Sequence, residues 1–253
     1  MGRVLWRLTI MLSMVLMPGC AGCGGAPVPD ARKPDDQNAI KNDDPKGPPV
    51  ANQRIEPIDP NDIVDLRDSR VDDQHLAKIV RMPGIVGLNL EGASNITDAG
   101  LSHLAAAPEL RWLNIGGLNI SAKGLSHLRQ APKLHSLYLG GMLVDDARLA
   151  ALTQLQQVRL LSIPYMGEAS LRTLAEKMPN LESLDLTSQA KADDELKPLR
   201  EFRKLRHLWL PHRAGDAALR TVQHLDTLQE LRLEFTGTVT SEGVRRIGTL
   251  REL

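Results

Sequence analysis

Cysteine is almost absent from this chain, and both copies, Cys20 and Cys23, lie near the N-terminus. The remainder can therefore hold no disulfide, no thiol nucleophile and no cysteine-based metal site. Aromatic residues make up only 3% of the chain, so the core must be aliphatic. Charge of one sign is not in excess either, because 31 basic residues balance 31 acidic ones. A nucleic-acid partner needs a basic surface, so we expect none.

Motifs for catalysis are missing as well. The sequence contains no H-E-x-x-H, no phosphate-binding loop and no G-x-S-x-G. His135, His207 and His212 do not fall where they could converge on one metal ion, because the first belongs to a repeat three strands away from the other two. We therefore expect a protein that is not an enzyme and that needs no metal or cofactor.

The N-terminus has the order of an export signal. Arg3 and Arg7 precede an apolar run over residues 8–17, which is short for a transmembrane helix. The run ends at Gly19-Cys20, and a small residue directly before cysteine resembles the lipobox of bacterial lipoproteins. This resemblance implies a signal peptide over residues 1–19 and a lipid on Cys20 that holds the protein to a membrane of the cell envelope. The alternative is cleavage without lipidation, which would give a secreted protein.

Residues 20–60 are expected to form a disordered tether. Eight of the 16 prolines fall between residues 24 and 60, and most of the other residues there are Asp, Lys, Asn and Gly. Such a segment cannot bury enough apolar surface to offset the entropy lost on ordering. It is either a spacer that lifts a domain off a membrane or a linker with no further role.

From residue 61 to residue 253 the pattern L-x-x-L-x-L recurs eight times, with gaps of 23 to 25 residues. The alternation L-x-L predicts a strand whose leucines point to one side of a sheet. The first slots of the pattern are Asn61, Ile85, Leu110, Leu134, Val158, Leu181, Leu205 and Leu228.

A short helix is predicted after each strand. An apolar pair spaced three residues apart, such as Leu101 and Leu104, places two side chains on one helical face. Acidic doublets such as Asp72-Asp73 fall at helix starts, where they stabilise the helix dipole. Four residues before each apolar pair lies a position rich in N-cap residues, namely Asp72, Thr97, Ser121, Asp145, Gly167, Ala192, Gly215 and Thr240.

One strand and one short helix per ~24 residues is typical of a leucine-rich repeat. The units, of which LNLEGASNITDAGLSHLAAAPEL is one, resemble bacterial leucine-rich-repeat proteins related in pattern to ribonuclease-inhibitor-like and F-box-associated repeats. The resemblance implies an α/β solenoid of about eight repeats, a right-handed horseshoe with a parallel sheet on the concave side and short helices on the convex side. The family's asparagine ladder cannot form, because its slots hold other residues, Leu118 and Met142 among them.

The x positions of the strands predict the binding surface. Outside the signal peptide the chain has six aromatic residues, and five of them fall at these positions together with four arginines. Trp, Tyr and Arg dominate the energetics of protein interfaces. The alternative is that aromatic residues simply favour strands. The candidate ligand-binding residues are Arg111, Trp112, His135, Tyr138, Arg159, Tyr165, Arg206, Trp209, Arg232 and Phe235.

These patterns favour a protein-recognition scaffold at the bacterial cell envelope. The second hypothesis is a carbohydrate-binding module that uses the same aromatic residues, and the third is a purely structural envelope protein. Leu253 falls on the first slot of a ninth strand with no polar capping unit after it. Because solenoids need capped ends to cover the last apolar face, we also expect self-association through this C-terminal edge.

Overall fold

The computed structural model describes residues 9–11, 58–59, 62–164, 166–187, 193–211, 214–234, 239–248 and 250. The chain divides into two units, residues 14–57 and the rest of the chain, residues 1–13 with 58–253. The first of these, which includes Cys20 and most of the predicted tether, lies outside the described residues. No helix among the described residues is both long and apolar enough to cross a bilayer.

Eight strands, one from each repeat, lie side by side in a parallel sheet, each next to the strand that follows it in sequence. They are β2 (Ile63–Asp65), β3 (Gly87–Asn89), β4 (Trp112–Asn114), β5 (Ser136–Tyr138), β6 (Leu160–Ser162), β7 (Ser183–Asp185), β8 (His207–Trp209) and β9 (Glu230–Glu234). The central residues of these strands pair across the sheet in one continuous row: Val64, Leu88, Leu113, Leu137, Leu161, Leu184, Leu208 and Leu231.

A further strand, β1 (Thr9–Met11), pairs in parallel with β9 and is the last strand at that edge of the sheet. It falls within the apolar run that the sequence assigns to a signal peptide. The sequence pattern did not predict this strand.

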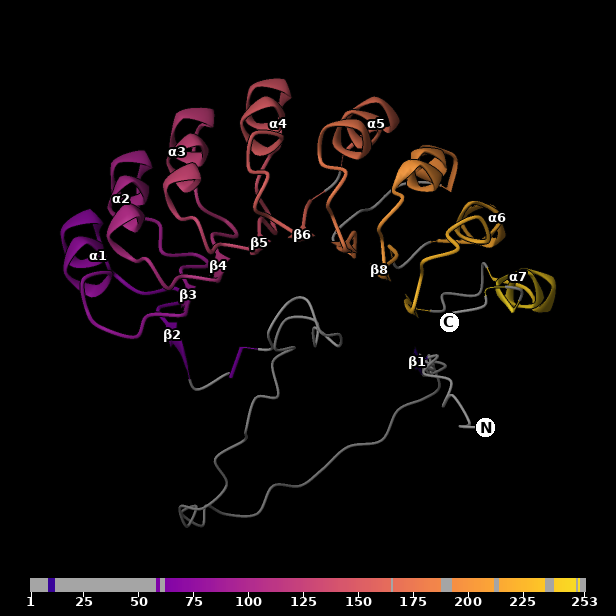
Figure 1. The fold of residues 1–253 in the computed structure, drawn as a ribbon, viewed down its shortest axis with the longest axis horizontal. Coiled ribbons are helices and arrows are strands. Elements are labelled where there is room, and N and C mark those ends of the chain that lie inside the picture. Colours follow the sequence, from indigo (N-terminus) through magenta and orange to yellow (C-terminus); the bar gives the residue numbers. More distant parts are fainter. Residues whose placement is uncertain are drawn as a thin grey trace, which may run out of the picture. The chain divides into compact units, whose positions relative to one another are not determined.

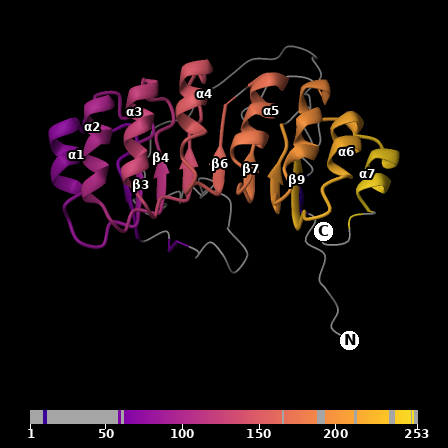
Figure 2. The same cartoon turned by 45° about the horizontal axis from the view of Figure 1, so that its top comes forward.

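A helix follows every strand from β2 to β9, and Figures 1 and 2 show these helices on the convex side of the sheet. One of them, η4, is a 3₁₀ helix that contains Pro198, whose missing N–H removes a backbone hydrogen bond. The helices are α1 (Asp73–Ile79), α2 (Asp98–Ser102) with η2 (His103–Ala106), α3 (Ala122–His127) with η3 (Leu128–Gln130), α4 (Asp146–Leu152), α5 (Glu168–Lys177), η4 (Asp193–Glu201), α6 (Asp216–Val222) and α7 (Ser241–Ile247).

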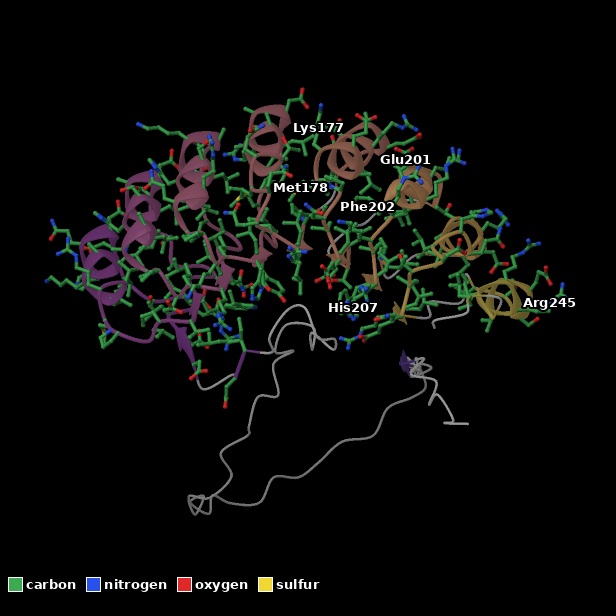
Figure 3. The ribbon with its side chains drawn as sticks, in the orientation of Figure 1. Lys177, Met178, Glu201, Phe202, His207 and Arg245 are labelled. Atoms are coloured by element: carbon green, nitrogen blue, oxygen red, sulfur yellow. The ribbon has the colours of Figure 1, made fainter. Side chains whose placement is uncertain are left out.

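The core lies between the sheet and the helices. Leu113, Leu137 and Leu161 of the central row are completely buried, and Figure 3 shows Met178 and Phe202 in the same layer, between the helices and the strands. The slots of the missing asparagine ladder also belong to this core, because Leu118 and Met142 are buried there. One repeat cannot cover its own apolar face, so stacking of neighbours stabilises the array.

Five of the predicted N-cap residues cap their helices through the side chain, as Thr97 does by accepting from the N–H of Ala99. Gly167 and Gly215 occupy the same position without a side-chain bond. Ala192 lies outside the described residues. The helix starts were thus predicted correctly wherever the structure describes them.

Neighbouring helices are joined by an aspartate that follows the cap. Asp73 accepts hydrogen bonds from the N–H and hydroxyl of Thr97, the cap of the next helix, at 2.9 and 2.6 Å. Asp216 holds Thr240 in the same way, at 2.9 and 2.6 Å, and Asp98 holds Ser121. We call this contact the inter-repeat clamp. The predicted effect on the helix dipole therefore describes only part of what Asp73 does.

Candidate binding surface on the concave face

The concave face is the side of the sheet that the helices leave open. Two pairing rows face it. The first contains Ile63, Gly87, Trp112, Ser136, Leu160, Ser183, His207 and Glu230, and the second contains Asp65, Asn89, Asn114, Tyr138, Ser162, Asp185, Trp209 and Arg232. Figure 3 shows His207 on this side of the sheet, away from the helices. Three of the predicted aromatic residues, Trp112, Tyr138 and Trp209, are thus placed on one face.

Trp112 and Tyr138 form the first aromatic cluster. Their ring centroids lie 5.1 Å apart at an interplanar angle of 43°, and this separation falls within the ~4.5–7 Å range of interacting aromatic pairs. Trp112 is partly exposed, whereas Tyr138 is only 8% exposed. Burial raises the pKa of the Tyr138 hydroxyl well above its usual value, so this group stays protonated.

Polar groups and open space adjoin this cluster. Asn114 donates to Glu91 at 3.0 Å, which links the second row of the concave face to the turn that follows β3. A β-carbon added to Gly140, two residues after Tyr138, would meet nothing within 4 Å. The surface beside the rings therefore has room for a ligand group.

Trp209 and Arg232 form the second cluster, four strands away on β8 and β9. The Arg232 guanidinium lies 5.6 Å from the ring centroid of Trp209, within cation–π range. His207 stacks on the same Trp209 ring at 6.2 Å, and its Nδ1 lies 2.9 Å from the hydroxyl of Ser183. Trp209 Nε1 and Arg232 Nε are buried and make no hydrogen bond to any residue in the described ranges.

The sequence pattern implied that the side chains at these strand positions are fully exposed. This prediction is wrong for several of them. Trp209 is 3% exposed, and Ser183 and His207 are 1% and 3% exposed. Strands in one sheet lie only ~4.8 Å apart, so large side chains on neighbouring strands cover one another. The accessible aromatic group of the described concave face is Trp112.

Between the clusters the face is crossed by polar contacts. Arg159 pairs with the buried carboxylate of Glu182 at 2.9 Å. Ser162 donates to Asp185 at 2.9 Å, and Asp185 also accepts from the N–H of Thr187 at 2.9 Å. These contacts join β6 to β7 and hold the middle of the concave face in one arrangement.

The predicted arginines other than Arg232 come directly before the strands. Arg111, Arg159 and Arg206 are partly exposed, as is His135, whose Nδ1 lies 2.9 Å from the hydroxyl of Ser136. They therefore line the edge of the concave face at the N-terminal ends of the strands. Tyr165, His212 and Phe235 lie outside the described residues.

The last position of several strands has a structural role that the sequence pattern did not predict. Asn89, Asn114 and Asp185 each accept the backbone N–H two residues later, and Asp65 does the same for Arg67. An Asx residue at this position ends the strand. Repeats that place Tyr138 or Trp209 there give up this bond. Such departures are a signal in the sequence that could have separated binding residues from structural ones.

Chemistry at this face is limited by burial. Ser183 and His207 are hydrogen-bonded, but a serine hydroxyl that is 1% exposed cannot reach a substrate. Within the part of the chain that the structure describes, no three His, Cys, Asp or Glu residues could hold a metal ion. The arrangement suits binding through aromatic and guanidinium groups.

Comparison with known proteins identifies the fold. No family model matches the sequence, and no curated protein matches it. Among solved structures, Rad7 in its complex with Elc1 from yeast has a TM-score of 0.56 and 17% identity over 72% of this chain and 51% of that chain. The chain has a leucine-rich-repeat fold.

Two internalins of Listeria monocytogenes are also similar to this leucine-rich-repeat chain. InlF has 20% identity and a TM-score of 0.47, over 74% of this chain and 51% of that one. InlC2 has 21% identity and a TM-score of 0.45, over 72% of each chain. The leucine-rich-repeat chain thus spans about half the length of InlF and of Rad7. The likeness to Rad7, at 17% identity, shows a shared fold and nothing further.

Proposed function

We propose that this leucine-rich-repeat protein binds a protein partner on its concave face. The observation that carries the proposal is the placement of Trp112 with Tyr138, and of Trp209 with Arg232, on one face of the sheet. Trp, Tyr and Arg are the residues that most often dominate binding energy at interfaces. Rad7, which shares the fold, was crystallised with a protein partner, Elc1.

The first test is capture of the partner from a native cell surface by chemical crosslinking, with wild type and Trp112→Ala compared. Trp112 is partly exposed, so its removal spares the core while it takes away the accessible aromatic anchor. We expect the yield of the captured partner to fall at least ~10-fold, the size of a lost hot spot. Met82→Ala, at a residue that is 59% exposed outside the sheet, is the control and should capture normally. Equal capture by wild type and Trp112→Ala would overturn the proposal.

A carbohydrate ligand is the second candidate. Sugars stack on aromatic rings and bond to carboxylate and amide groups, and Trp112 has Asn114 and Glu91 nearby, with open space at Gly140. A glycan array separates the two candidates. Binding of a defined glycan that Trp112→Ala abolishes would support this candidate over a protein partner.

We further propose that the protein is exported and held to the cell envelope by a lipid on Cys20. The support is the basic and apolar N-terminal sequence that ends at Gly19-Cys20. Labelled fatty acid should be incorporated into wild type and lost in Cys20→Ser, while Cys23→Ser keeps the label. Label that survives Cys20→Ser would refute the anchor.

A further inference from the structure

An exposed carboxylate lies beside the accessible Trp112 of the concave face. Glu91 comes directly after the turn out of β3, and its Oε2 accepts a hydrogen bond from the side-chain amide of Asn114 at 3.0 Å. Asn114 is on β4, two residues after Trp112 and on the same side of the sheet. Residues two apart on a strand lie ~6.6 Å from each other, so Asn114 holds the carboxylate within reach of a group that stacks on Trp112.

Gly116 leaves room for the Glu91 side chain. A β-carbon on Gly116 would lie 3.5 Å from Cγ of Glu91 and only 2.9 Å from the carbonyl oxygen of Gly140, so a side chain there would displace its neighbours. Asn114 bonds to both residues, since its Oδ1 accepts the N–H of Gly116 at 2.9 Å while its amide donates to Glu91. The Glu91 side chain is therefore held across the sheet, toward β4.

The charge of Glu91 is not compensated. Its carboxylate forms no ion pair with any residue in the described ranges. Arg67, in the turn after β2, is paired with Asp65 at 2.9 Å. Asp68 of the same turn also lacks a cationic partner among the described residues, and its N–H donates to the carbonyl of Glu91 at 2.8 Å. This part of the face therefore carries a negative field, although the whole chain has no net charge.

Open space and an apolar side chain adjoin the carboxylate. Gly140 lies next to the turn of the preceding repeat, because its carbonyl accepts the N–H of Gly117 at 2.7 Å. A β-carbon added to Gly140 would meet nothing within 4 Å. Leu143, three residues later, is 76% exposed. An aromatic ring, a carboxylate and room for a side chain are thus found together at this end of β4 and β5.

We propose that this site binds an arginine side chain of the protein partner, with the guanidinium stacked on Trp112 and hydrogen-bonded to the carboxylate of Glu91. This proposal rests on the proposed function, because it names the chemistry of the partner at the same face. A guanidinium suits both contacts, since its planar fork pairs with a carboxylate and its flat face stacks on an aromatic ring. Apolar residues next to this arginine in the partner then contact Leu143.

The negative charge favours an arginine over other ligands of this site. A neutral sugar would contact the ring and Asn114 but would leave the charges of Glu91 and Asp68 uncompensated. Nucleic acid and other polyanions would be repelled by the same two carboxylates. A cationic side chain on a polypeptide compensates the charge and also stacks on Trp112.

The test uses the full chain and a short synthetic peptide with one arginine between leucine residues, titrated by NMR, which detects weak binding. A second peptide has citrulline in place of the arginine, so it keeps the shape and loses the charge. We expect the arginine peptide to bind at least ~10-fold more tightly, the effect of one charge-assisted hydrogen bond. Its affinity should fall as salt is added, because exposed charges are screened.

Glu91→Gln keeps an acceptor for Asn114 and removes the charge. It should weaken binding of the arginine peptide by ~10-fold and leave binding of the citrulline peptide unchanged. Glu176→Gln makes the same change at an exposed residue of α5, on the helical side, and should bind as wild type does. Trp112→Leu keeps an apolar side chain but loses the ring, so it should also weaken binding of the arginine peptide. Circular dichroism of the variants checks that the fold is kept.

Three results would overturn the arginine-site proposal. They are equal binding of the two peptides, equal effects of Glu91→Gln and Glu176→Gln, or binding of a neutral glycan by a chain that does not bind the arginine peptide. If the captured partner depends on Trp112 but not on Glu91, the arginine site fails while protein recognition at the concave face stands. If the partner depends on neither, both proposals fail.

Discussion

At the scale of single residues, the motif Thr-Asp-x-Gly combines three structural roles. Thr97 caps its own helix, Asp98 accepts from the next cap, Ser121, and Gly100 leaves room for Asp73 of the previous repeat. A β-carbon on Gly100 would lie 2.1 Å from Asp73 Oδ1, far inside contact distance. The glycine is therefore required by the neighbouring repeat rather than by its own backbone.

The substitution Gly100→Ala should lower the free energy of unfolding by about 1–3 kcal/mol, because the added methyl displaces the clamp. Urea denaturation followed by circular dichroism measures the change. Asp73→Ala removes the obstructing oxygen, so Gly100→Ala should cost much less in that background. Gly140→Ala, where a β-carbon meets no atom, should be neutral or slightly stabilising. Equal effects of both alanines in wild type would contradict the clamp.

At the scale of elements, the clamp ties each helix start to the next. The clamp between α6 and α7 lowers the pKa of its carboxyl. Hydrogen bonds from Thr240 hold the pKa of Asp216 below its ordinary value of 3.8. Folding thus favours the ionised form of Asp216. Its contribution is present above pH 3.8 and is lost as the pH falls through the lowered folded-state pKa.

Asp216→Asn keeps an acceptor oxygen but cannot ionise. We expect it to be less stable than wild type at neutral pH and equally stable once the pH lies below the lowered pKa of Asp216. Chemical denaturation across this pH range measures the difference. Asp226→Asn makes the same charge change at an exposed residue that takes no part in a clamp and serves as the control. A constant difference between Asp216→Asn and wild type at every pH would rule out the electrostatic account.

The strands and helix starts were predictable because the information is local. Alternating leucines specify the buried side of a strand, and a polar residue before an apolar pair specifies a cap. The clamps were not predicted, because Asp73 and Thr97 meet only once the repeats are stacked. The burial of Trp209 was missed for the same reason, since its cover includes Arg232 of the next repeat. The run over residues 8–17 resembles an export signal, and this masked the strand β1.

At the scale of the whole molecule, the described repeats place one sheet face outside the reach of the helices (Figure 1). The apolar residues of each strand pack in the core, so the residue type at the positions between them can vary from repeat to repeat. Trp112, Tyr138 and the arginines that precede the strands, Arg111, Arg159 and Arg206, occupy such positions. Variation at fixed positions on a regular frame is what a recognition surface requires.

Oxidative footprinting of the partner complex tests the central claim, recognition through the concave face, most directly. Trp112 on the concave face and Met82 outside the sheet are both accessible and both react with hydroxyl radicals. The account predicts that partner binding protects Trp112 from oxidation and leaves Met82 unchanged. Protection of Met82 with continued oxidation of Trp112 would contradict it.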